Sequence, residues 1–83
     1  MSWNKFYVYQ YVREDGSPFY IGKGSKNRIN ESHAPYVSVP APEFRKVVND
    51  NLTEDEAYKF EVSLIKKYKR KIDGGILENK KIS

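Results

Sequence analysis

The stretch "KFYVYQYVREDGSPFYIG", residues 5–22, decides the fold because strand signals stand on both sides of a turn signal. Residues 5–12 are rich in aromatic and β-branched side chains and carry no helix signal, so they predict a strand. Asp-Gly and a proline in "REDGSP" supply turn chemistry, and "FYIG", residues 19–22, predicts a second short strand. The stretch therefore predicts an antiparallel β-hairpin.

The first strand is expected to have two different faces, because successive side chains of a strand point to opposite sides. One face holds three tyrosines, Tyr7, Tyr9 and Tyr11, and the other holds Phe6, Val8 and Val12, with Gln10 among them. The chain has seven tyrosines in all. Strand propensity explains the cluster near the N-terminus. The other explanation, a group of phenols that take part in site chemistry, stays open.

The next segment, "KGSKNR", is expected to break the second strand, since Gly22 and Gly24 allow a close backbone approach or a positive φ. Ser25 or Asn27 is a candidate N-cap for a helix over about residues 26–33. The segment "HAPYVSVPAP" carries three prolines, which excludes a helix or a central strand there. A loop over residues 34–42 is therefore predicted.

The C-terminal half predicts a further strand and a long helix. Residues 43–50 form a short helical turn or a third strand, and their two adjacent valines favour the strand. Thr53 followed by Glu56 matches a capping box, and an amphipathic helix over about residues 54–70 follows it. The tail adds a last turn or strand. The prediction is a single α+β domain over residues 1–83, with a small three-stranded antiparallel sheet flanked by helices.

The composition of the 83 residues limits the class of protein. Without cysteine the chain has no disulfide and no thiolate metal site, which fits a reducing compartment. The N-terminus has no apolar signal region, and no segment is long and apolar enough to span a membrane. We therefore expect an intracellular, cytoplasmic protein.

The formal net charge of +4 is modest, so the distribution of the basic residues says more than their number. An early cluster consists of Lys23, Lys26 and Arg28, and a late cluster consists of Lys59, Lys66, Lys67, Lys69, Arg70 and Lys71. Each cluster is either a solvated face or a surface that contacts phosphate groups.

One carboxylate stands where the long helix needs apolar side chains. In "AYKFEVSLIKKY", residues 57–68, an apolar stripe follows helical spacing, and Glu61 points along it. Desolvating an unpaired carboxylate is unfavourable, so a buried Glu61 requires a partner. The side chain lies at the margin of the stripe, pairs with a buried cation, or binds a metal at the floor of a cleft.

Other residues suit a metal and a phosphate. A carboxylate is a preferred ligand of Mg²⁺, which fills its other positions with water and phosphate, and Arg28 offers a bidentate fork for phosphate. His33 is the only histidine, and a lone histidine is more often structural than catalytic. Tyr9 and Tyr20 lie on the two strands of the hairpin and face each other only in some registers.

The hairpin resembles the GIY-YIG nuclease family, which is named after two short motifs on adjacent strands. The second motif is present as "YIG", residues 20–22, and the first appears as "YVY", residues 7–9, with its final tyrosine retained. Tyr9 and Tyr20 have the separation that the family shows. The second motif runs on into "GKG", as in one branch of stand-alone or appended domains.

Three later residues extend the resemblance to about residues 5–79. Arg28 matches the arginine on the family's first helix, Glu61 matches a metal-binding glutamate on a later helix, and Asn79 in "ILEN" matches a late asparagine. The chain also departs from the pattern. The first motif has lost its glycine and isoleucine, and His33 lies five residues after Arg28, where the family's histidine or tyrosine usually lies four after. Tyr36 is another candidate for that role.

The resemblance implies a metal-dependent endonuclease that hydrolyses phosphodiester bonds of DNA. Glu61 would bind one Mg²⁺ or Mn²⁺, and Arg28 would neutralise charge on the phosphate oxygens. Tyr9 would accept the proton of the attacking water with Tyr20 as its partner, or the two would exchange roles. Asn79 would orient a water or the phosphate.

The basic residues complete this expectation. Lys23, near Tyr20, would favour a phenolate together with the metal. The residues expected to hold backbone phosphates without reading sequence are Lys23, Lys26, Arg28, Lys66 and Lys67.

Two other functions stay open. The chain could be a nucleic-acid-binding module that keeps the fold without the chemistry, or a small interaction protein that uses tyrosines in a homodimer. The expected partner is DNA, with a homodimer or a separate targeting partner as a further possibility. Neither a membrane nor an organic cofactor is expected.

Overall fold

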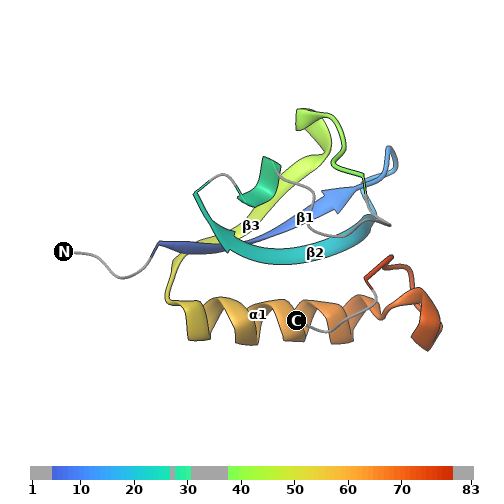
Figure 1. Cartoon of the computed structure of the whole chain (residues 1–83). Coiled ribbons are helices and arrows are strands. Elements are labelled where there is room, and N and C mark those ends of the chain that lie inside the picture. Colours follow the sequence, from blue (N-terminus) through green and yellow to red (C-terminus); the bar gives the residue numbers. More distant parts are fainter. Residues whose placement is uncertain (1–4, 27, 31–37, 80–83) are drawn as a thin grey trace.

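The computed structural model describes residues 5–26, 28–30 and 38–79. Its elements, in chain order, are β1 (Phe6–Val12), β2 (Pro18–Ser25), the 3₁₀ helix η1 (Arg28–Asn30), the 3₁₀ helix η2 (Pro42–Phe44), β3 (Arg45–Leu52), α1 (Glu54–Tyr68) and the 3₁₀ helix η3 (Lys71–Asp73). The strands form one antiparallel sheet in the order β2-β1-β3. Helix α1 lies along one face of this sheet (Figure 1). The predicted α+β class and three-stranded sheet are therefore confirmed.

The hairpin between β1 and β2 forms where the sequence predicts it. Gly16 takes a positive φ of 88° in the turn, and the Asp15 carboxylate accepts a hydrogen bond from the Ser17 amide at 2.9 Å. The prediction that "KGSKNR" breaks the second strand is wrong for its first part, because β2 continues to Ser25. The glycines of β2 do not break the strand; they leave room for side chains that cross it.

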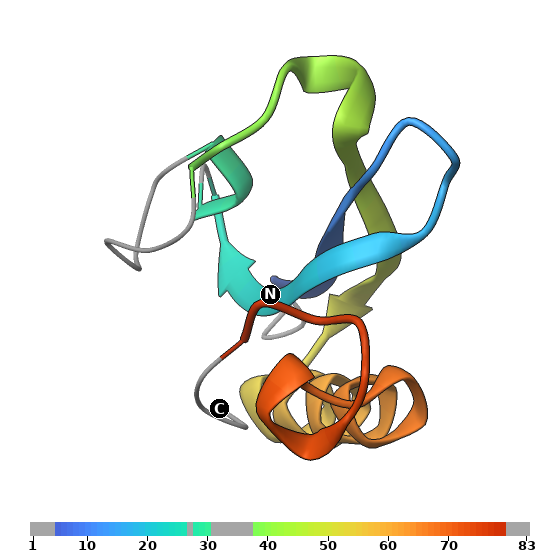
Figure 2. The same cartoon turned by 90° about the vertical axis from the view of Figure 1, so that its right-hand side faces the viewer.

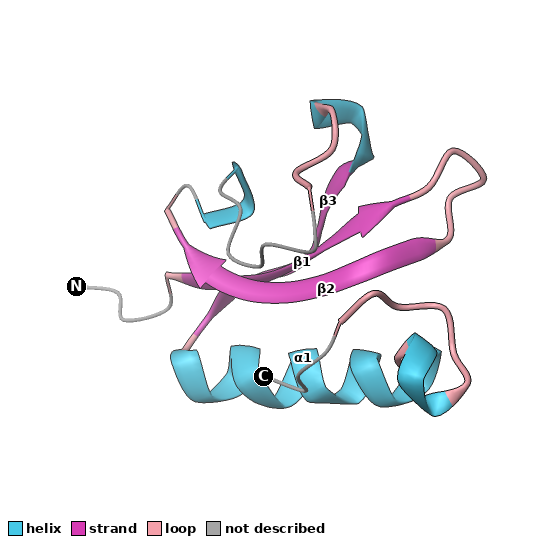
Figure 3. Ribbon diagram, turned by 45° about the vertical axis from the view of Figure 1, so that its right-hand side comes forward, coloured by secondary structure: helices cyan, strands magenta, loops and turns pink. Residues whose placement is uncertain are grey.

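Both faces of the central strand β1 are covered. On the α1 side, the buried core consists of Val8, Ile21, Ala57, Ile65 and Leu77. On the other side, Tyr9 and Tyr11 are buried in a second cluster. The elements η1 and η2 lie on this second side of the sheet (Figure 3). The alternation predicted for the first strand is thus confirmed, and each face has its own cluster.

Helix α1 begins where its sequence predicts and ends slightly before the predicted end near residue 70. The Thr53 hydroxyl accepts a hydrogen bond from the Glu56 amide at 3.1 Å, and the Glu56 carboxylate accepts one from the Thr53 amide at 2.9 Å, so the capping box is confirmed. The helix ends at Tyr68, before Lys69 with φ 64°. The chain then turns back and runs beside β2, where Leu77 is buried (Figure 2).

Two other predicted segments differ from the structure. The helix predicted over 26–33 is represented among the described residues by η1 alone, and Lys26 has a φ of 55°, which no α-helix allows. Residues 27 and 31–33 lie outside the described residues. For residues 43–50 a short helical turn or a third strand is predicted, and the structure has both, since η2 ends at Phe44 and β3 begins at Arg45.

Strand β3 is an irregular edge strand. Its pairing with β1 shifts register twice, near Val8. Asn51 takes a φ of 58° close to the end of the strand. Bulges of this kind bend an edge strand and hinder its pairing with another chain.

Candidate active site

Glu61 is buried beneath β2. It lies on the face of α1 that packs against the sheet, with Ala57 and Ile65 one turn away on either side, and only 6% of the residue is exposed. Among the described residues, its Oε1 atom is buried and has no hydrogen-bond partner. The margin explanation is therefore wrong, since the carboxylate is not in water.

The environment of Glu61 disfavours its charged form. Burial raises the pKa of the carboxyl from 4.5 to about 7, although the Lys23 ammonium and a hydrogen bond from the Lys23 amide act in the opposite direction. Lys23 of β2 is thus only a partial partner for the buried Glu61 carboxylate, because Oε1 still lacks a hydrogen bond among the described residues. A carboxylate oxygen without a hydrogen-bond partner is a suitable ligand for a hard divalent metal.

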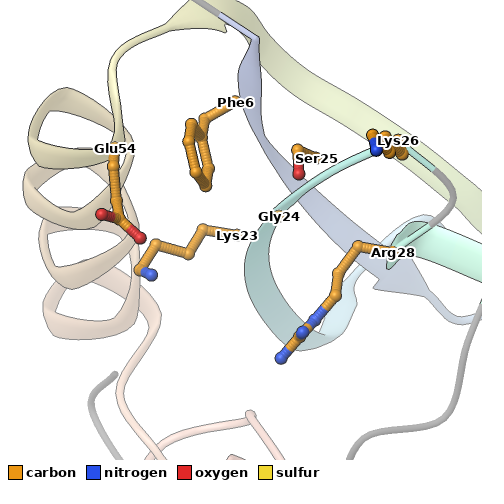
Figure 4. Close-up of a pocket in the computed structure, with 7 residues that line it drawn as sticks. All are labelled: Phe6, Lys23, Gly24, Ser25, Lys26, Arg28 and Glu54. Atoms are coloured by element: carbon orange, nitrogen blue, oxygen red, sulfur yellow. The ribbon is translucent and has the colours of Figure 1, made fainter.

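An open pocket of about 580 Å³ lies at the end of β2. Three of its lining residues are basic, Lys23, Lys26 and Arg28, and Glu54 in the first turn of α1 lines the opposite wall. Figure 4 shows Lys23 extending toward Glu54, with the guanidinium of Arg28 on the other side. The early basic cluster predicted from the sequence therefore gathers around one cavity.

Two glycines of β2 determine how the side chains near this pocket lie. A Cβ on Gly22 would be 2.5 Å from the Cζ and hydroxyl oxygen of Tyr9, and a Cβ on Gly24 would overlap the Cβ and Cγ atoms of Arg28. The Tyr9 ring and the stem of Arg28 therefore lie directly on the glycine main chain. The "YIGKG" segment is shaped for these two contacts, which explains why both glycines belong inside a strand.

The tyrosines of the hairpin form a continuous cluster. Tyr9 pairs with Gly22 and Tyr11 pairs with Tyr20. Tyr9 and Tyr20 are diagonal neighbours with ring centroids 6.4 Å apart, whereas Tyr11 and Tyr20 stack at 5.5 Å. In this register Tyr9 and Tyr20 are therefore not directly opposite each other, although their rings remain close.

Tyr9 is poorly suited to lose its proton in the free protein. Burial, together with the neighbouring Tyr11 and Tyr20, raises the pKa of its hydroxyl well above the usual value, and only the charge of Arg28 acts in the opposite direction. Only 1% of Tyr9 is exposed. A role as proton acceptor therefore requires extra positive charge near the phenol.

Asn79 is fixed against the outer edge of β2. Its Oδ1 accepts a hydrogen bond from the Ile21 amide at 3.0 Å, and its Nδ2 donates to the Ile21 carbonyl at 2.8 Å. The Glu78 amide adds a bond to the Phe19 carbonyl at 2.6 Å. This arrangement favours a positioning role for Asn79 over the predicted one of orienting a water or the phosphate, which stays a prediction.

Of the predicted site residues, the pocket lining includes Lys23, Lys26 and Arg28, and it does not include Tyr9, Tyr20, Glu61 or Asn79. His33 and Tyr36 lie outside the described residues. Lys66 and Lys67 are exposed in the last turn of α1, at the opposite end from Glu54. The Lys67 ammonium lies 5.3 Å from the centroid of the Tyr68 ring. The late basic cluster is therefore a separate surface.

Sequence reasoning missed the contribution of Tyr7 and Tyr11. Tyr7 bonds with Lys26 and Ile29, and Tyr11 bonds with Ile29, so their hydroxyls hold the segment that includes η1. The only signal for this role was the repetition of tyrosine on one face of the first strand.

The described part of the chain contains no group of three or more histidine, cysteine, aspartate or glutamate side chains that could hold a metal. A single carboxylate is nevertheless enough for Mg²⁺ when water and phosphate complete its coordination.

No helix among the described residues is long and apolar enough to cross a membrane. Comparison of the chain with known protein families, characterised proteins and solved structures gives no match.

Proposed function

We propose that this chain is a divalent-metal-dependent DNA endonuclease of the GIY-YIG type. The observation that carries the proposal is the buried carboxylate of Glu61, whose Oε1 has no partner among the described residues and which lies next to Lys23 of the basic pocket. Structural carboxylates in a core are normally paired. An unpaired buried carboxylate brings no benefit to a binding module, whereas a metal site needs a carboxylate that is free to bind the ion.

In this proposal each site residue has a separate role. Glu61 would hold Mg²⁺ or Mn²⁺ through Oε1. When bound, the ion supplies Lewis-acid stabilisation of the charge on the phosphate. Arg28 contacts the non-bridging oxygens of the phosphate with its guanidinium. Lys23 and Lys26 hold neighbouring phosphates at the pocket.

Tyr9 acts as a neutral hydroxyl in the resting protein, because its pKa is raised. In this form it would orient the attacking water by hydrogen bonding. It could accept the proton of that water only as a phenolate, after its own proton has left to solvent, and the positive charge of Arg28 favours that form. Tyr20, whose ring lies next to that of Tyr9, completes the wall behind this water. Asn79 keeps β2 in place.

The test is cleavage of supercoiled plasmid and of a branched synthetic duplex, with Mg²⁺ and with EDTA. Glu61→Ala is expected to lose cleavage and keep DNA binding, and Glu43→Ala, a change at an exposed glutamate of η2, serves as the matched control. Metal-dependent cutting by wild type and control, absent from Glu61→Ala, supports the proposal. Cleavage by Glu61→Ala at the wild-type rate removes Glu61 from the site.

A nucleic-acid-binding module is the second candidate, and the raised pKa of Tyr9 favours it because the free protein holds no ready base among its buried tyrosines. Under this function neither substrate is cut, and both bind with an affinity that falls steeply with salt. That result would leave the basic pocket as a phosphate site and Glu61 as a structural residue.

A further inference from the structure

The tyrosine face of β1 carries three hydroxyl groups, and the proposed function uses only the middle one. The hydroxyl of Tyr7 donates to the Lys26 carbonyl at 2.7 Å and accepts from the Ile29 amide at 2.9 Å. The hydroxyl of Tyr11 donates to the Ile29 carbonyl at 2.8 Å. Both main-chain polar groups of Ile29 are therefore bound by side chains of a single strand.

These bonds replace the restraint that an α-helix would have provided. Helix η1 has three residues, so it makes few main-chain hydrogen bonds of its own. Further support comes from β3, where Arg45 Nη1 donates to the Asn30 side chain at 2.7 Å and Arg45 Nε donates to the Pro40 carbonyl at 2.8 Å. Side chains of the sheet thus hold η1 from two strands.

The consequence falls on Arg28, the residue before Ile29. Its stem lies on Gly24, where a Cβ would overlap the Cβ and Cγ atoms of the arginine. The main chain is held on one side by the tyrosine hydroxyls, and the stem is held on the other by β2. The guanidinium therefore projects from a fixed base into the pocket (Figure 4).

We propose that Tyr7 and Tyr11 are positioning residues, whose hydroxyls hold the main chain of Ile29 so that Arg28 is preorganised for its phosphate. Preorganisation of this kind lowers the barrier without any contact between the tyrosines and the substrate. The family pattern does not supply this role, since Tyr7 stands where the first motif normally has glycine. The catalytic part of the inference rests on the proposed function. The hydrogen bonds of the Tyr7 and Tyr11 hydroxyls to Lys26 and Ile29, called the clamp below, are present in the free protein.

The clamp is tested first on the free protein, without DNA or metal. Tyr7→Phe removes the acceptor of the Ile29 amide, so we expect hydrogen exchange of that amide to become about tenfold faster. Tyr58→Phe, at an exposed tyrosine of α1, is the matched control and should leave the exchange rate unchanged. Equal exchange in wild type and Tyr7→Phe overturns the proposal.

The positioning role is tested by a double-mutant cycle in single-turnover cleavage. Tyr7→Phe should lower the rate about five- to tenfold, with DNA affinity little changed. In an Arg28→Ala background the same change should have almost no further effect, because the group that it positions is gone. If the substitution lowers the cleavage rate by the same factor with and without Arg28, the tyrosine has a general structural role, and this result contradicts the proposal.

A wild type that cuts no DNA refutes the proposed function and leaves the clamp to be judged separately. The same cycle is then scored on DNA affinity at low salt, since Arg28 contacts phosphate in a binding module as well. Coupling between Tyr7 and Arg28 in affinity supports the positioning role. Independent effects overturn it.

Discussion

Replacing Glu61 with glutamine is expected to stabilise the metal-free protein at pH 8 and to leave its stability nearly unchanged at pH 4. The pKa of this carboxyl is about 7 in the folded protein and 4.5 in a solvated reference. Between these values the folded state keeps a proton that the unfolded state has lost, so the free energy of unfolding falls as pH rises. The penalty is complete above pH 7 and absent below pH 4.5.

The magnitude follows from the difference between the two pKa values. At ~1.4 kcal/mol for each pH unit, the charged carboxylate lowers stability by up to about 3 kcal/mol at pH 8. Glutamine retains a carbonyl oxygen that can accept the hydrogen bond from the Lys23 amide, and it carries no charge that must be desolvated. The gain at pH 8 should therefore be a substantial part of this figure.

Urea denaturation in EDTA at pH 4, 6 and 8 measures this gain. Subtracting the wild-type free energy of unfolding at each pH isolates the contribution of residue 61 from other titrating groups. Glu43→Gln, at an exposed position, should show no such trend. A Glu61→Gln variant that is less stable than wild type at pH 8, or a stability difference that does not change with pH, would show that the charged Glu61 carboxylate does not destabilise the fold. Adding Mg²⁺ should stabilise wild type and not the variant.

Four further changes test other parts of the structure. Tyr9→Phe should reduce single-turnover cleavage by about 100-fold or more while urea midpoints change little; wild-type cleavage would move the water-positioning role elsewhere. Asn79→Leu should lower stability by about 1–3 kcal/mol, because the Ile21 amide and carbonyl lose their partners, and an unchanged urea midpoint would contradict this account. Gly22→Ala should destabilise by about 1–3 kcal/mol through the overlap with Tyr9, measured by thermal unfolding. Thr53→Ala should lower stability by about 1 kcal/mol through loss of the capping box, with no effect on cleavage per folded molecule.

The features predicted from the sequence are those that local pattern determines. The hairpin and the capping box of α1 depend on residues close together in the chain, and both are confirmed. The inward direction of Glu61 follows from helical periodicity alone. Periodicity says nothing about the atoms facing the carboxylate, so the missing partner of Oε1 became visible only in the structure.

The features that were not predicted depend on contacts between distant residues. Of the two expectations for Gly22 and Gly24, the close backbone approach is confirmed, but the sequence does not show that a tyrosine ring and an arginine stem are the groups that approach. The expected helix after β2 gives way to a short 3₁₀ turn, held by tyrosine hydroxyls 18 to 22 residues away. No local propensity encodes such bonds.

The pairing of Asn79 with Ile21 spans 58 residues, and this separation bears on how the protein folds. The hairpin can form within microseconds from neighbouring residues, but the outer edge of β2 is covered only after the chain has built α1 and turned back. Closing so large a loop is entropically unfavourable and comes late, as in other domains whose contacts are distant in sequence. Until Asn79 binds, we expect the main-chain groups of Ile21 at the open edge of β2 to be available for pairing with another chain.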